Sequence, residues 1–151
     1  MASTATLHTL IDLAVERKNK AAQQFAQAAA THKQARERMV LIESYRADYE
    51  TRMRTHAGTG IDGVRVANYS RFIQQLTEAV EQQQKEVERC TLMLNHTRDA
   101  FFAEERKVKS FEILAKRETE RQASSDAKQV QKQIDEFANR RSFGPSTGFS
   151  L

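Results

Sequence analysis

The chain has 151 residues, no Trp, 7% aromatic and 29% charged residues, and a formal net charge of +4. Ala, Gln, Glu, Lys and Arg dominate, which is typical of long helices and coiled coils and argues against a thick globular core. Charges of both signs are interspersed and no basic stripe carries interleaved aromatics, so no nucleic-acid binding is expected. A single cysteine, Cys90, excludes a disulfide framework and fits a reducing compartment. No apolar stretch is long enough for a signal peptide or a membrane span, so we expect a soluble, cytosolic chain.

Glycine and proline, the residues that end helices, occur in only two places. They are Gly58, Gly60 and Gly63 in the middle and Gly144, Pro145 and Gly148 near the end. The sequence therefore predicts a helix over about 4–56, a turn over 57–65 and a second helix over about 66–141. Residues 1–141 would form one domain, followed by a disordered tail over 142–151.

Along both predicted helices, seam residues recur at alternating gaps of three and four, mostly apolar, which keeps one stripe facing a partner helix. Helices this long are not stable alone, so the two must share this seam. The first helix contributes Leu7, Ile11, Ala14, Lys18, Ala21, Phe25, Ala28, His32, Ala35, Met39, Ile42, Arg46, Tyr49 and Met53. The second contributes Tyr69, Ile73, Leu76, Val80, Gln83, Val87, Cys90, Leu94, Thr97, Phe101, Glu104, Val108, Phe111 and Ala115.

The two stripes fit each other if the chain reverses near Ile61. Four alanines of the first helix then face larger apolar residues of the second, as close packing requires. Lys18 falls opposite Glu104, the only acid in either seam, and this pair is expected to fix the register. The predicted fold is all-α: a long antiparallel two-helix coiled-coil hairpin with an unpaired C-terminal helical overhang.

The overhang carries an apolar stripe of its own. Beyond Ala115 no part of the first helix remains to pair with the second, yet a stripe follows at Ala123, Ala127, Val130, Ile134 and Phe137. An uncovered apolar face usually marks an interaction site. The alternative is a frayed helix that orders only in crystals or oligomers.

A second candidate interface flanks the seam near the turn. The register places Tyr45 beside Phe72 and Arg38 beside Ala79 on one edge. Aromatic side chains of this kind are enriched at binding hot spots. The alternative is a widened seam that only tightens the hairpin tip.

No catalytic, cofactor or metal site is expected. Residues 58–63 spell GxGxxG, but no strand precedes them, so they indicate a turn and no dinucleotide site. The four histidines have spacings that suit no metal site. His32 lies in the seam opposite Cys90, where a polar core layer is the better explanation than a nucleophile with its base.

The turn region contains Gly58-x-Gly60-Ile61, followed by Asn68-Tyr69-x-x-Phe72-Ile73-x-x-Leu76 with Ala79. This segment resembles the FliJ family of flagellar export proteins. The resemblance extends along the chain through Leu10, Asp12-Leu13-Ala14, Tyr45, Tyr49 and Asp135-Glu136-Phe137-Ala138.

This resemblance implies a non-enzymatic component of the flagellar type III export apparatus, similar in fold to the γ stalk of rotary ATP synthases. The family's helical termini enter the hexameric export ATPase ring and promote its assembly and activity. Other implied partners are the cytoplasmic domain of the export gate protein and the export chaperones that the chain escorts. The free chain would be a cytoplasmic monomer, held at the cytoplasmic face of the inner membrane through its partners.

The family's surfaces correspond to two sets of residues here. The gate-binding surface corresponds to Arg38, Ile42, Tyr45, Tyr49, Phe72, Leu76, Ala79 and Gln83, of which positions 38 and 83 depart from the family pattern. The ATPase-ring-binding end corresponds to Leu7, Leu10, Val130, Ile134 and Phe137. Two alternatives remain: the equivalent stalk of a virulence-type secretion injectisome, and a purely structural coiled coil that homodimerises.

Overall fold

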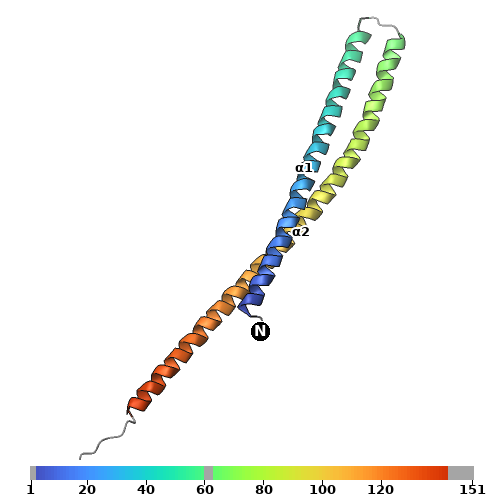
Figure 1. Ribbon diagram of the computed structural model, residues 1–151. Helices are drawn as coiled ribbons and strands as arrows, with labels where there is room; N and C mark the ends of the chain where they lie inside the picture. Colours follow the sequence, from blue (N-terminus) through green and yellow to red (C-terminus); the bar gives the residue numbers. More distant parts are fainter. Residues whose placement is uncertain (1–2, 60–62, 143–151) are drawn as a thin grey trace, which may run out of the picture. The chain divides into compact units, whose positions relative to one another are not determined.

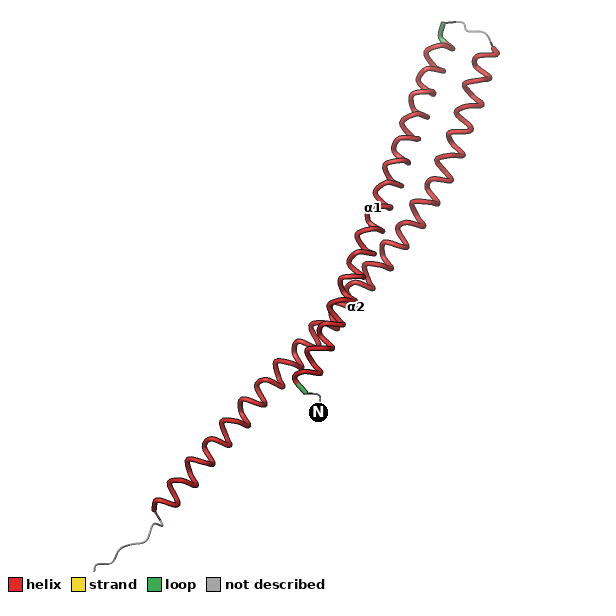
Figure 2. Tube along the Cα trace, in the orientation of Figure 1, coloured by secondary structure: helices red, strands yellow, loops and turns green. Residues whose placement is uncertain are grey.

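The computed structural model describes residues 3–59 and 63–142, which form two α-helices (Figure 1). Helix α1 spans Thr4–Ala57 and helix α2 spans Gly63–Ser142. Within these ranges the chain has no proline and only two glycines, Gly58 and Gly63, so nothing interrupts either helix. The all-α helical fold predicted from the sequence is confirmed, and Figure 2 shows helix along nearly all of the described chain.

Both ends of α1 are closed by hydrogen bonds. Ser3 precedes the helix, where its hydroxyl accepts a hydrogen bond from the backbone N–H of Thr6 at 3.2 Å and its carbonyl accepts one from Leu7 at 3.0 Å. This is the arrangement of an N-cap, which satisfies amides that have no partner inside the helix. At the other end the amide of Gly58 donates to the carbonyl of Arg54 at 3.2 Å. Thr59 then donates to the carbonyl of His56 through both its amide and its hydroxyl.

Helix α2 begins at Gly63, three residues before the predicted start near Val66. The first amides of a helix need no partner within it, so a glycine at the first position costs the helix little. The last described residue, Ser142, is still helical, and the predicted tail from residue 143 onward lies outside the described residues.

The chain divides into two compact units. The hairpin unit comprises residues 16–105, in which α1 and α2 run antiparallel on either side of the turn (Figure 1). The terminal unit comprises residues 3–15 at the start of α1 and residues 106–142 of α2. Each unit has its own buried seam.

In the hairpin unit, every predicted seam residue is buried or half-buried. The most deeply covered side chains of α1 are small, namely Ala21, Ala28 and Ala35, whereas Val80 and Cys90 are buried on α2. Phe25 and Phe101 lie in ring contact with centroids 6.1 Å apart. Three alanines are thus the most covered residues of α1 in this unit, as close packing of two helices requires. The register places Phe101 opposite Ala21, whereas its ring contact is to Phe25, one helical turn along α1.

In the terminal unit, the same pairing continues to the N-terminal end of α1. Leu7, Ala14 and Val108 are buried there, and the hydroxyl of Thr4 donates to the side-chain oxygen of Gln122 at 3.4 Å. Beyond this point α2 runs without a partner, and residues 119–142 are all exposed. The predicted overhang is therefore present as a helix.

The alanine seam generates the first prediction. Ala35 is 5% exposed, so Ala35→Leu should force the helices apart and destabilise the protein by about 1–3 kcal/mol. Urea unfolding followed by circular dichroism measures the change. Ala30→Leu is the matched control, because Ala30 is exposed on the same helix and should change stability by less than about 0.5 kcal/mol. Equal effects at the two positions would contradict the close approach of the helices at Ala35.

Candidate functional site

The candidate site is the edge of the hairpin unit nearest the turn, which we call the tip edge. It consists of the residues singled out in the sequence, and the structure gives them different exposures. Tyr45 and Phe72 expose 49% and 39% of their surface, and Arg38 is also exposed. Ile42, Tyr49, Leu76, Ala79 and Gln83 are half-buried. The tip edge therefore presents two aromatic side chains on a base of seam residues.

Aromatic rings from both helices pack together at the tip edge. The ring of Tyr49 lies 4.4 Å from that of Phe72 and 6.2 Å from that of Tyr69, measured between centroids. His56 stacks on Tyr69 at 5.7 Å. Such ring pairs contribute about 0.5–1.5 kcal/mol beyond the area that they bury. The register predicts Tyr45 beside Phe72, whereas the ring contact of Phe72 runs to Tyr49, one helical turn nearer the turn of the hairpin.

These rings line a groove with a volume of about 250 Å³. Its other walls are Arg65 and Asn68 of α2. The guanidinium of Arg52 lies 5.4 Å from the centroid of the Tyr49 ring, which is cation–π distance. An apolar side chain of a binding partner could enter this groove, while polar groups of the same partner contact Arg52 and Arg65 at its rim.

Two polar side chains of the seam bond across the two helices of the hairpin unit. The amide of Gln83 donates to the backbone carbonyl of Ala35 at 2.9 Å, and His32 shares a hydrogen bond of 3.0 Å with Thr91. Gln83 belongs to the predicted gate-binding surface, but its side-chain amide is engaged within the seam. The sequence places His32 opposite Cys90, and its bonded partner is the next residue along α2.

Charged residues around the middle of the hairpin unit pair locally. Arg89 donates from Nε to Glu86 at 3.0 Å, and this hydrogen bond holds the pKa of the Glu86 carboxyl below its ordinary value. The Cys90 thiol is buried and lies 3.8 Å from the same carboxylate. Lys18 and Glu104 are both half-buried at their seam positions, and their role in fixing the register stays a prediction.

The terminal unit carries the second candidate surface. Val130, Ile134 and Phe137 of the overhang expose 55%, 55% and 63% of their surface, and Arg141 lies over the Phe137 ring at 5.8 Å. Leu7, by contrast, is only 6% exposed and Leu10 is half-buried. Leu7 is therefore part of the seam, and its assignment to the ATPase-ring-binding end stays a prediction.

Among the residues that the structure describes, no group of three His, Cys, Asp or Glu side chains could hold a metal ion. In the same part of the chain, neither helix contains a segment apolar enough to cross a bilayer. Among the exposed apolar side chains, those of the tip edge and of the overhang stripe coincide with the residues singled out in the sequence.

Fold and surfaces together define an all-α helical-hairpin protein whose candidate sites are exposed side chains on helices. The profile of the flagellar FliJ protein family matches residues 3–146. The chain is 29% identical over 140 residues to the flagellar FliJ protein of Salmonella typhi, covering 93% of this chain and 95% of that protein. It is 26% identical over 140 residues to the flagellar FliJ protein of Escherichia coli strain K12, with the same coverage. The chain belongs to the FliJ family of flagellar export proteins, which confirms the resemblance found around the turn.

The ring contacts at the tip edge generate a second prediction. A double-mutant cycle of Tyr49→Ala and Phe72→Ala should give a coupling energy of about 0.5–1.5 kcal/mol, because the two rings touch. Urea unfolding of the four proteins measures it. The matched cycle of Tyr45→Ala and Phe102→Ala joins two exposed aromatics far apart on the hairpin unit and should show additivity. Additivity in both cycles would mean that the Tyr49 and Phe72 rings do not stabilise one another.

Proposed function

We propose that the chain is a non-enzymatic stalk of the flagellar type III export apparatus, as the family assignment and the sequence resemblance together suggest. Its terminal unit would bind the hexameric export ATPase ring and promote the ring's assembly and activity. Its tip edge would bind the cytoplasmic domain of the export gate. The chain would also escort export chaperones, and it would work at the cytoplasmic face of the inner membrane.

The observation that carries this proposal is the separation of two exposed apolar surfaces on two different units. The tip edge is in the hairpin unit, and the stripe of Val130, Ile134 and Phe137 is in the terminal unit. The exposed aromatics Tyr45 and Phe72 and the overhang stripe lie outside the seam, whereas the other apolar residues of the tip edge are half-buried and mostly belong to the seam. Exposed apolar side chains at helical spacing support docking to other proteins. A protein with two such surfaces can hold two partners at once.

The proposed stalk is similar in kind to the γ stalk of rotary ATP synthases, which seats helical termini in a ring of ATPase subunits. In this proposal catalysis belongs to the ATPase. The family match supports a flagellar over an injectisome stalk, and the ATPase that co-purifies with the chain distinguishes the two.

The gate-binding surface is tested by replacing both of its exposed aromatics. Tyr45→Ala with Phe72→Ala should weaken binding to the purified cytoplasmic domain of the gate at least tenfold, because hot-spot aromatics carry much of an interface's binding energy. Binding to the ATPase and helix content should stay unchanged. Calorimetry and circular dichroism supply these measurements. Equal loss of gate binding, ATPase binding and helicity would show that the tip edge only supports the hairpin.

The ATPase-binding surface is tested by placing a charge on the overhang stripe. Phe137→Asp should reduce stimulation of the export ATPase several-fold, because a carboxylate buried in an apolar interface has to lose its hydration. Ser125→Asp adds the same charge to the opposite face of the same helix, at an exposed position, and is the control. Identical stimulation curves for Phe137→Asp and the unchanged chain would show that the overhang is not part of the interface with the ATPase.

An exposed stripe on an unpaired helix also favours one other candidate, a structural coiled coil that homodimerises through the overhang. Analytical ultracentrifugation separates the two functions. The stalk requires a monomer until its ring is supplied, whereas the structural coiled coil requires a stable dimer that Phe137→Asp dissociates.

A further inference from the structure

The net charge of the chain is concentrated at the turn end of the hairpin unit. The described residues 51–59 and 63–71 contain four arginines and one histidine, and no carboxylate. The arginines are Arg52, Arg54, Arg65 and Arg71. Residues 51–71 also include Asp62 in the turn, so this segment carries a net charge of +3 out of the chain's +4. The rest of the chain has 20 basic and 19 acidic residues and is nearly balanced in charge.

Helix stability explains only part of this cluster. The last turn of α1 contains Arg54 and His56, and cations at a helix C-terminus are favourable. The first turn of α2 has no acidic residue and contains Arg65, where a cation is unfavourable. Arg65 therefore has no explanation in the stability of its own helix.

Pairing within the fold does not explain the cluster either. The register that places Tyr45 beside Phe72 places Arg52 beside Arg65, one heptad nearer the turn. Edge positions of coiled coils usually pair opposite charges, and two arginines there repel each other. None of the four arginines forms an ion pair with a carboxylate of the described residues. Their charge is available to an external anion.

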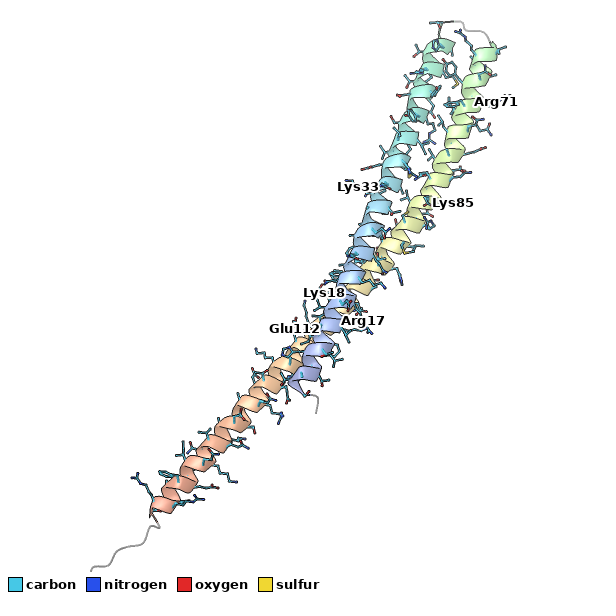
Figure 3. The ribbon with its side chains drawn as sticks, viewed as in Figure 1. Arg17, Lys18, Lys33, Arg71, Lys85 and Glu112 are labelled. Carbon is cyan, nitrogen blue, oxygen red and sulfur yellow. The ribbon has the colours of Figure 1, made fainter. Side chains whose placement is uncertain are left out.

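The positions of the arginines indicate an extended anionic surface. Arg52 and Arg65 lie beside the aromatic groove, whereas Arg54 and Arg71 are exposed at outer positions of α1 and α2, with Arg71 near the turn in Figure 3. A peptide bound in the groove therefore meets only Arg52 and Arg65. An anionic partner that contacts all four arginines has to extend over more than one face of the hairpin.

We propose that the turn end of the hairpin binds bilayers containing anionic phospholipids, through Arg52, Arg54, Arg65 and Arg71. Clustered basic residues bind such surfaces through the negative surface potential, and the attraction falls with salt. The choice of a lipid surface rests on the proposed function, in which the chain works at the cytoplasmic face of the inner membrane. Direct lipid contact goes beyond that function, because there the chain reaches the membrane through proteins alone.

Co-sedimentation of the full chain with vesicles tests this proposal, in the absence of gate and ATPase. We expect binding to vesicles of phosphatidylglycerol and phosphatidylcholine, at least tenfold weaker binding to phosphatidylcholine alone, and loss of binding at high salt. Arg52→Gln, Arg54→Gln, Arg65→Gln and Arg71→Gln combined should reduce binding at least tenfold. The matched control replaces four exposed arginines elsewhere by Gln, namely Arg36, Arg98, Arg106 and Arg117. It removes the same charge and should retain most of the binding.

A second measurement does not depend on the stability of the arginine variants. In a Cys90→Ser background, an environment-sensitive fluorophore at Thr59→Cys should change its emission on adding the anionic vesicles. The same fluorophore at Ser110→Cys, an exposed position in the other unit, should not. Equal responses at both sites, equal binding to neutral vesicles, or equal loss in the control variant would each overturn the proposal.

Failure of this proposal is distinguishable from failure of the proposed function. Suppose that the chain fails to bind anionic vesicles and yet binds the purified gate domain only when the four arginines are present. In that case the arginines recognise an acidic protein surface, and the lipid proposal is wrong. Gate binding itself is tested separately, by the variant lacking the aromatics Tyr45 and Phe72.

Discussion

Close packing of alanines against larger side chains along the seam is the interaction on which the other features depend. Ala21, Ala28 and Ala35 are nearly covered, so the helices of the hairpin unit approach closely at these positions. A larger residue would separate the backbones, and the hydrogen bond from Gln83 to the carbonyl of Ala35 would be lost. Because α1 and α2 lie close together, the interface between them is narrow. Side chains at its edges remain exposed because two helices have no third layer to cover them.

Those edges supply the surfaces assigned to function. Tyr45 and Phe72 stay exposed at the tip edge, although both would be buried in a bundle of three or four helices. The side chains of the overhang are exposed for a similar reason, because α1 begins at Thr4 and no part of it packs against the last part of α2. In a fold with so little interior, most of the chemical information lies in the pattern of side chains along two helices. Such a pattern suits recognition by other macromolecules.

Spacing along the sequence was sufficient to predict the helices, the seam and the antiparallel packing of the two helices, because each follows from helix periodicity and from where glycine occurs. It was insufficient for contacts that depend on side-chain rotamers. Phe72 meets the ring of Tyr49 although the register puts Tyr45 beside it, and His32 bonds Thr91 although Cys90 lies opposite. The burial of Leu7 follows from the seam, while a resemblance between sequences assigned it to a partner surface. The four arginines can be read from the sequence, but that Arg52 and Arg65 lie beside the same aromatic groove is known only from the structure.

The overhang has a thermodynamic consequence that follows from its continuity with the paired part of α2. An isolated helix of this length is marginal in water because starting its first turn is unfavourable, whereas adding a residue to an existing helix costs little. The paired segment of α2 supplies that existing helix, so the overhang elongates without a nucleation step of its own. A partner that grips Val130, Ile134 and Phe137 then meets side chains already set at helical spacing, and less entropy is lost on association than for a segment that folds as it binds.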